Sequence, residues 1–169
     1  MATRRELLSW NEVVRLIDHL IPQLDVEFDV MVIVTRGGII PGGMLCEALK
    51  IEIVLTAAVD FPFEAERQAA KLMAWPKFIQ FPEVENITDR NVLVVDDVWG
   101  SGRTITAVKN RISSAGGTPY TCVLHFNPYR SLFSQARPDY FAAITDAYIV
   151  YPWEVDRGTD KVLLDEPEG

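Results

Sequence analysis

A run of residues near the middle of the chain constrains the fold more than any other feature. An apolar, β-branched stretch, residues 92–95, is followed by the carboxylates Asp96 and Asp97, by a Gly/Ser-rich turn and by a helical pattern. An apolar run that is continuous rather than alternating is typical of a parallel strand covered on both faces. We therefore expect this strand to end at the two carboxylates, at the carboxyl edge of an open α/β sheet, where the ligands of such sheets bind.

The turn after the carboxylates indicates what kind of ligand could bind there. Residues 100–104 would present backbone N–H groups at the N-terminus of the next helix, and such groups favour a phosphate. Two carboxylates beside a phosphate cradle suit a ligand with a phosphate at one end and neighbouring hydroxyls further along. A ribose 5-phosphate has that shape.

Composition limits the class of protein and its partners. The chain has 169 residues, which fits a single domain, residues 1–169, with a sizeable core. Its formal net charge of −8 argues against a nucleic-acid partner, because phosphate backbones attract basic surfaces. The N-terminal residues lead into no signal-peptide core, and no apolar run approaches the roughly 18 residues of a membrane span. We therefore expect a cytoplasmic protein with no membrane partner.

The spacing of apolar residues predicts alternating strands and helices. Besides residues 92–95, short apolar runs predict strands at residues 30–34, 51–59, 121–126 and 148–150. Helical spacing predicts helices at residues 10–21, 42–49 and 105–115, and a capping-box pattern at Ser9 and Glu12 opens the first. This order predicts an α/β fold in which helices flank a mostly parallel central sheet.

Two segments do not follow this alternation. Residues 60–89 contain several prolines and aromatic residues without a clean period, so we expect either a functional flap or antiparallel strands at the sheet edge. Residues 127–169 are expected to contribute to the same small hood or flap region of the single domain.

Residues 92–104 resemble the phosphoribosyl-diphosphate (PRPP) binding motif of the type I phosphoribosyltransferases. In that family four apolar residues precede two acidic residues, and two apolar positions and a short Thr/Ser-Gly-x-Thr turn follow. The segment does not match the nucleoside-triphosphate loop, nor Gly-x-Gly-x-x-Gly, because Ile105 stands at the third glycine position. The alternative interpretation is an acidic strand end followed by an ordinary helix cap.

The resemblance implies a role for each position of this motif. Asp96 and Asp97 would face the 2- and 3-hydroxyls of the ribose, Asp97 through a magnesium ion, Mg²⁺. The backbone N–H groups of the turn would hold the 5-phosphate, with help from two hydroxyl side chains. The implied phosphate-binding residues are Gly100, Ser101, Gly102, Arg103 and Thr104. For Arg103 a solvated charge at a helix start is an equally open interpretation.

A second motif follows the first central strand. On its own the sequence Thr35-Arg-Gly-Gly38 would be a plain turn. At the carboxyl end of a strand, about sixty residues before the acidic pair, it resembles the pyrophosphate loop of the same family. The resemblance implies that Arg36 and the backbone amides of Gly37 and Gly38 contact the leaving diphosphate.

A third motif lies near the C-terminus, where the chain reads Tyr148-Ile-Val-Tyr-Pro-Trp153. From its pattern alone this is an aromatic-rich strand and turn that belongs to the core. It resembles the Trp/Tyr-Ile-x-x-Pro-Trp segment of xanthine-guanine phosphoribosyltransferases. The resemblance implies that Tyr148 stacks on a purine base and that the carbonyl group of Ile149 reads an exocyclic group, whereas Trp153 is structural.

Two departures from the purine enzymes bear on the choice of base. Those enzymes carry Asp where this chain has Gly100, and that Asp contacts N7 of the base. They carry Lys where this chain has Asn127, and that Lys contacts O6 of a 6-oxopurine. Replacing the lysine by an amide removes a charge-assisted hydrogen bond of roughly 1.5–3 kcal/mol. Asn127 can still donate or accept.

Together the three motifs predict a type I phosphoribosyltransferase closest to the xanthine-guanine enzymes. It would transfer the ribose 5-phosphate of PRPP to a nitrogenous base, expected to be a purine, and release diphosphate, with Asp96, Asp97 and Arg36 as catalytic residues and Mg²⁺ as cofactor. The resemblance also implies purine salvage and a homodimer or higher homo-oligomer. Two alternatives stay open: a non-catalytic regulatory protein that binds PRPP or a nucleotide, and a phosphoribosyltransferase for a non-purine acceptor.

Overall fold

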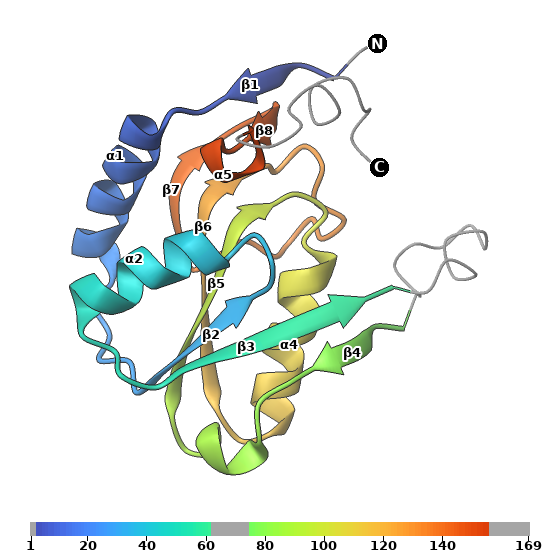
Figure 1. The fold of residues 1–169 in the computed structure, drawn as a ribbon. Coiled ribbons are helices and arrows are strands. Elements are labelled where there is room, and N and C mark those ends of the chain that lie inside the picture. The colour runs from blue at the N-terminus through green and yellow to red at the C-terminus, as the bar shows by residue number, and fades with distance from the viewer. Residues whose placement is uncertain (1–2, 62–74, 156–169) are drawn as a thin grey trace.

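A six-stranded sheet lies at the centre of the structure (Figure 1). The structure is a computed structural model and describes residues 3–61 and 75–155. The strand order is β4-β3-β2-β5-β6-β7; β4 is antiparallel to β3, and the other neighbours are parallel. The strands are β2 (Val30–Val34), β3 (Val54–Asp60), β4 (Lys77–Gln80), β5 (Asn91–Trp99), β6 (Thr118–Phe126) and β7 (Tyr140–Ile144). The predicted fold class, a mostly parallel sheet flanked by helices, is confirmed.

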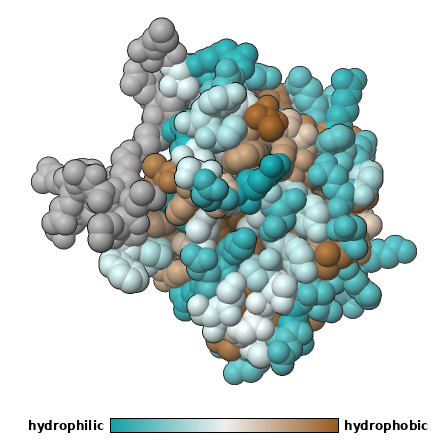
Figure 2. All heavy atoms as spheres, turned by 180° about the vertical axis from the view of Figure 1, so that it is seen from behind, coloured by the Kyte–Doolittle hydropathy of each residue, from teal (hydrophilic) through white to brown (hydrophobic). Residues whose placement is uncertain are grey.

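Helices cover both faces of this sheet. The helices α1 (Trp10–Leu20) and α2 (Ile39–Leu49) lie on one face, and α4 (Arg103–Ser114) lies on the other (Figure 1). The strands β1 (Arg5–Leu7) and β8 (Tyr148–Val150) form a separate two-stranded parallel sheet. The remaining short helices are η1 (Ile21–Gln23), η3 (Val84–Asn86) and α5 (Pro152–Val155). Seen from the α4 side, the surface is mostly polar, and hydrophobic residues occupy smaller areas (Figure 2).

The side chains of β2 show why the sequence reads as a continuous apolar run. Val30, Val32 and Val34 pack in the core that α4 covers. Met31 and Ile33 pack in the core beneath α1 and α2. Burying each of these side chains stabilises the fold by roughly 1.5–3 kcal/mol, so a polar residue at either kind of position would be costly.

The first helix begins as its sequence predicts. The hydroxyl of Ser9 accepts a hydrogen bond from the backbone N–H of Glu12 at 3.2 Å, and the Glu12 carboxylate accepts one from the backbone N–H of Ser9 at 2.7 Å. Val13, Ile17 and Leu20, which are spaced along one face of α1, are buried. The capping box and one apolar face therefore fix both the start and the orientation of α1.

The direction in which the chain crosses the sheet reverses between β2 and β5. From β2 the chain moves to β3 on one side, whereas from β5 it moves to β6 on the other. The loops that leave the carboxyl ends of these neighbouring strands therefore diverge, and a crevice between them is the usual ligand site of an open α/β sheet. Both predicted phosphate-contacting loops leave from this place.

Several element boundaries differ from the sequence predictions. The strand β5 does not end at the acidic pair but runs on to Trp99, because its pairing with β6 continues to Phe126. The strand at 148–150 is present, but it pairs with β1 and lies outside the central sheet. Neither β1 nor β7 was predicted, since β1 is short and polar and β7 has no clear alternation.

The segment 60–89 is described only in part. Its strand β4 pairs antiparallel with β3 at the edge of the sheet, as one of the two open interpretations expects. The expected flap at 62–74 lies outside the described residues, as does 156–169 of the expected hood. Among the described residues, no helix is long and apolar enough to cross a membrane.

The packing of Gly38 gives a first prediction. A Cβ atom on Gly38 would lie 2.3 Å from the carbonyl oxygen of Val95 and 2.8 Å from that of Val34, whereas nothing lies within 4 Å of a Cβ on Gly43. Gly38→Ala should therefore lower the free energy of unfolding by about 1–3 kcal/mol, because backbone must move. The matched variant Gly43→Ala, on the exposed side of α2, should raise it by up to about 1 kcal/mol. Urea denaturation measures both, and equal stabilities of the two variants would contradict this packing.

Candidate active site

The two predicted loops meet at the carboxyl edge of β2 and β5. A Cβ atom on Gly37 would lie 2.5 Å from the carboxylate atoms of Asp97, so only glycine lets the loop after β2 approach this side chain. Gly38 is packed just as closely against the backbone of β5. The peptide bond between Thr35 and Arg36 is cis, and Arg36 is exposed. The structure thus brings the residues of the predicted pyrophosphate loop next to the acidic pair.

The acidic pair lies within β5 and forms no ion pair with any residue that the structure describes. Asp96 is half-buried and Asp97 is 8% exposed. Asp96 accepts a hydrogen bond from the backbone N–H of Asp97 at 2.8 Å, and Asp97 accepts one from that of Val98 at 2.7 Å. The ion pairs between described residues join Arg4 to Glu6 and to Asp146, outside this site. Within residues 3–61 and 75–155, no ion pair neutralises the charge that these two carboxylates would carry.

Burial perturbs the ionisation of both carboxyl groups. Desolvation raises the pKa of Asp97 to about 6, and the nearby Glu154 carboxylate adds to this increase. Desolvation, followed by repulsion from Asp97, raises the pKa of Asp96 well above its usual range. Two like charges in a low-dielectric site resist ionisation together, so a bound cation would stabilise this pair strongly.

The predicted phosphate turn forms the N-terminus of α4. Gly102 has φ +81°, and a Cβ atom there would lie 2.3 Å from Nε1 of Trp99, so glycine is required on both grounds. No side chain of this N-cap residue closes the helix, and the hydroxyl of Ser101 accepts only the N–H of Arg103, at 3.3 Å. Uncapped N–H groups at the positive end of a helix dipole suit an anion.

For Arg103 the sequence left two interpretations open, a phosphate-binding residue and a solvated charge at a helix start, and the structure shows a different contact. Its guanidinium lies over the ring of Phe61, with Cζ 4.1 Å from the ring centroid. The side chain therefore packs on the aromatic residue that follows β3 and is not a freely solvated charge. This cation–π contact limits the freedom of the side chain beside the turn.

The predicted base-binding residues line one pocket of about 90 Å³ next to the acidic pair. Asn127, Tyr148 and Ile149 all contribute to its walls, together with Asp97 and Gly100. Pairing of β1 with β8 places Tyr148 opposite Arg5, whose guanidinium lies 5.7 Å from the centroid of the tyrosine ring. Space is open at Gly100, since a Cβ there would meet nothing within 4 Å.

Asn127 is held in one orientation by the turn that follows it. The residue is 2% exposed, and its Oδ1 accepts hydrogen bonds from the backbone N–H groups of Tyr129 and Arg130, both at 3.2 Å. Its amide nitrogen makes no hydrogen bond within the described residues. The sequence left open whether Asn127 donates or accepts; here the acceptor is used, and the donor is the group left for a ligand.

Sequence reasoning missed Glu154 as a neighbour of the site. Glu154 lines the same pocket, and its carboxylate accepts the backbone N–H of Tyr151 at 2.7 Å. Burial raises the pKa of Glu154, whereas the positive charge of Arg36 lowers it. Arg36, in the loop after β2, is therefore near enough to interact electrostatically with this wall of the pocket. An acidic residue three positions after Tyr151, at the start of a short helix, was the signal that could have indicated it.

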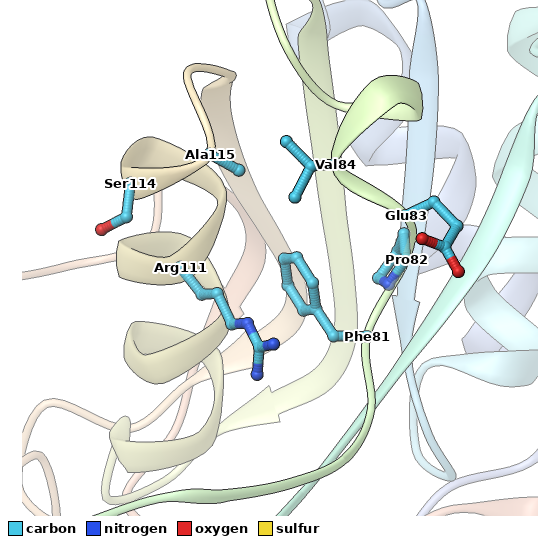
Figure 3. A pocket seen from close by; sticks show the side chains of 7 residues that line it. All are labelled: Phe81, Pro82, Glu83, Val84, Arg111, Ser114 and Ala115. Carbon is cyan, nitrogen blue, oxygen red and sulfur yellow. The ribbon is translucent and has the colours of Figure 1, made fainter.

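A larger cavity lies elsewhere. Its volume is about 380 Å³, and it lies between the C-terminal part of α4 and residues 81–84 (Figure 3). Arg111 in its wall packs over the rings of Phe78 and Phe81, at 4.3 and 4.5 Å from their centroids. None of the predicted site residues lines this cavity, so the smaller pocket beside Asp97 is the candidate site.

The match to a protein family decides the identity of the chain. A sequence model described as the phosphoribosyl transferase domain matches residues 3–149. The chain belongs to this family. The protein is therefore a phosphoribosyltransferase, as the three motifs predicted, and the pocket beside Asp97, next to the loop after β2, is the candidate active site of that enzyme.

Solved structures with the same fold include other phosphoribosyltransferases. The purine phosphoribosyltransferase of Pyrococcus horikoshii is 28% identical, with a TM-score of 0.75, over 89% of this chain and 94% of that one. The xanthine-guanine-hypoxanthine phosphoribosyltransferase of Helicobacter pylori is 18% identical, with a TM-score of 0.75, over 94% and 99%. A hypothetical protein of Neisseria gonorrhoeae with bound ppGpp is 23% identical, with a TM-score of 0.76, over 95% and 94%. At these identities the last two show a shared fold.

The raised pKa of Asp97 in this phosphoribosyltransferase predicts a pH-dependent cost in stability. Its pKa rises from 3.8 to about 6, so ionisation destabilises the ligand-free fold; the cost is absent below pH 4 and complete above pH 6. Asp97→Asn keeps an oxygen for the N–H of Val98 and should be more stable than the parent at pH 7.5 by about 1–3 kcal/mol. This difference should vanish near pH 4.

Urea denaturation across this pH range measures the effect. Asp18→Asn, which removes an exposed carboxylate on α1, is the matched control and should show no such difference. An Asp97→Asn variant that is no more stable than the parent at pH 7.5 would show that the acidic pair is not strained by burial.

Proposed function

We propose that this phosphoribosyltransferase transfers the ribose 5-phosphate of PRPP to a purine base that carries an oxo group, and releases diphosphate. The choice of base rests on Asn127, which lines the pocket beside Asp97 and whose amide nitrogen makes no hydrogen bond to another described residue. Since the oxygen of Asn127 is already bonded to two backbone N–H groups, the residue can recognise an acceptor such as an oxo group but not a donor such as an exocyclic amine.

The geometry of the crevice supports a place for each part of PRPP. The uncapped N-terminus of α4, with Gly100, Ser101, Gly102, Arg103 and Thr104, suits the 5-phosphate. In this proposal Asp96 and Asp97 bind the ribose hydroxyls. The loop after β2, with Arg36, Gly37 and Gly38, lies against Asp97 and binds the diphosphate. Tyr148 and Ile149 form a wall for the base.

The reaction needs positioning and charge more than proton transfer. The bond between C1 of the ribose and the diphosphate oxygen breaks, and its electrons leave with the diphosphate. The lone pair of a ring nitrogen of the base forms the new bond to C1, and the base releases its ring N–H proton to water. Positive charge develops on the sugar ring, and the negative field of Asp96 and Asp97 favours it. Arg36 stabilises the charge that develops on the leaving diphosphate. Holding base and sugar in line supplies a further part of the rate.

The residues present fit a magnesium ion as cofactor. Asp96 and Asp97 offer largely buried carboxylate oxygens that form no ion pair with another described residue, and such oxygens are the donors that Mg²⁺ prefers. Within the described ranges no three His, Cys, Asp or Glu residues form a complete metal site, so Asp97 would share the ion with substrate oxygens and water. When bound, the ion would neutralise charge on the diphosphate.

Two other functions can be distinguished from this one. A nucleotide-binding regulatory role is the second candidate, because a protein with bound ppGpp shares this fold and because Gly100 replaces an acidic residue of the purine enzymes. A non-purine acceptor is the third. Purine salvage would follow from the main proposal, and the homodimer and the cytoplasmic location stay predictions.

A panel of bases tests the function directly. Purified protein with PRPP and Mg²⁺ should release diphosphate with at least one of hypoxanthine, guanine and xanthine, and not with adenine or a pyrimidine. Asp97→Asn should slow this release by about a hundredfold or more, since the field at the sugar ring is lost. Release with pyrimidines alone would favour the third candidate, and tight nucleotide binding without release from any base would favour the regulatory role.

Asn127→Asp tests how the base is read. The aspartate keeps an oxygen for the N–H groups of Tyr129 and Arg130 but replaces the donor by an acceptor. We expect kcat/KM for the oxopurine to fall by about 10–100-fold, because an acceptor would face an acceptor. Asn110→Asp, on the exposed side of α4, is the matched control and should change nothing. An unchanged kcat/KM in Asn127→Asp would mean that this amide does not read the base.

A further inference from the structure

Two buried side chains that no predicted role includes form a chain of hydrogen bonds behind the acidic pair. The hydroxyl of Tyr151 donates a hydrogen bond to the backbone carbonyl of Asp97 at 3.0 Å. The same hydroxyl lies 2.9 Å from Nδ1 of His125. Tyr151 is 1% exposed and His125 is 6% exposed, so water does not compete for these bonds. The chain joins β5, β6 and the segment after β8.

The positions of the protons in this chain follow from its chemistry. A carbonyl oxygen can only accept, so the single hydroxyl proton of Tyr151 is committed to Asp97. The tyrosine oxygen can then only accept from Nδ1 of His125, which must carry a proton. His125 is therefore the Nδ1–H tautomer with a bare Nε2. Burial lowers the pKa of His125 to about 4, in agreement with a neutral ring at neutral pH.

Asp97 lies where the sheet holds β5 on one side only. The pairing of β5 with β2 ends at Val95, whereas the pairing with β6 continues to Trp99. Beyond Val95 the other side of β5 faces the loop after β2, and Gly37 packs there without a side chain. The bond from Tyr151 is thus an additional constraint on the Asp97 peptide at a point where strand pairing is incomplete.

Tyr151 is itself held rigidly. Its ring stacks on that of Trp153 at a centroid distance of 4.6 Å and an interplanar angle of 3°. Trp153 in turn packs against Trp10 of α1, with centroids 6.0 Å apart. The backbone N–H of Tyr151 donates to the Glu154 carboxylate at 2.7 Å. A hydroxyl on a ring that is buried and packed in this way can orient a partner, because the stacking and the backbone hydrogen bond restrict its position.

We propose that Tyr151 and His125 are positioning residues, which hold the Asp97 peptide, and through it the Asp97 carboxylate, in the orientation that binds the ribose of PRPP. The inference rests on the role proposed for Asp97. Tyr151 follows Ile149 by two residues, so one short segment forms a wall of the base pocket and also fixes a ribose-binding group.

Tyr151→Phe tests this inference, with Tyr140→Phe as its matched control. Both variants remove one hydroxyl that makes a hydrogen bond; the Tyr140 hydroxyl donates to Asp25 at 3.0 Å and lies on β7, outside the site. Calorimetric titration with PRPP and Mg²⁺ should show a dissociation constant about tenfold higher in Tyr151→Phe and unchanged in Tyr140→Phe. Equal constants in both variants would overturn the inference.

Asp97→Asn in the same titration separates the two proposals. If Asp97→Asn weakens PRPP binding and Tyr151→Phe does not, the positioning role fails and the role of Asp97 stands. If Asp97→Asn binds PRPP like the parent, the role of Asp97 fails and the inference fails with it. Weakened binding in both variants supports both proposals, whatever base the enzyme uses.

The hydrogen-bond chain has a spectroscopic signature that does not depend on activity. In ¹⁵N spectra of the imidazole groups, His125 of the parent should show a protonated Nδ1 and a bare Nε2. Tyr151→Phe should shift His125 toward the Nε2–H tautomer, and Tyr140→Phe should not. An Nε2–H tautomer in the parent would contradict the chain itself.

A second pair of variants covers the case in which Tyr151→Phe does not fold. His125→Asn keeps an N–H donor near the position of Nδ1, whereas His125→Leu has none. His125→Asn should bind PRPP closer to the parent than His125→Leu does. Equal affinities of these two variants would show that the donor to Tyr151 has no role in positioning.

Discussion

The packing of Gly37 against the carboxylate of Asp97 is the contact on which the rest of the site depends. It brings the loop after β2 onto the acidic pair of β5, because no side chain stands between them. The reversal of chain direction at these two strands creates the crevice, and glycine lets its two walls approach. A loop that contacts diphosphate and a strand that contacts ribose can then serve a single substrate molecule.

The second constraint is the negative charge of the two carboxylates next to this contact. Asp96 and Asp97 are adjacent and largely buried, and they have no cation among the described residues, so the ligand-free protein loses stability by ionising them. Substrate with a divalent cation would supply the missing positive charge. The ligand-free site destabilises the fold, and binding of the charged ligand relieves this destabilisation. Such a compromise between stability and function is common.

Much of this arrangement could be predicted from the sequence, because local pattern decides it. The continuous apolar run of β2 indicates burial on both faces, and Gly37, Gly38 and Gly102 mark close approaches that tolerate no Cβ. The boundaries depended on partners far away in the sequence. The strand β5 extends beyond its apolar run because β6, which is longer than β2, continues to pair with it. The strand β8 lies outside the central sheet because it pairs with β1.

The chemistry of single side chains was harder to predict than their positions. Asn127 could be placed beside the base, but only the turn that follows shows that its oxygen is already used. Tyr151 was an unremarked position inside a motif, and its hydroxyl reaches Asp97 only because β8 and β5 meet in space. Sequence spacing carries no information on such contacts between distant segments.

A crystal structure of the protein with PRPP and Mg²⁺ tests the central claim most directly. We expect the 5-phosphate on the backbone N–H groups of residues 100–104, the diphosphate against residues 35–38, and the ribose hydroxyls facing Asp96 and Asp97. Electron density for PRPP at another place, or a crevice between β2 and β5 that stays empty at saturating ligand, would contradict it.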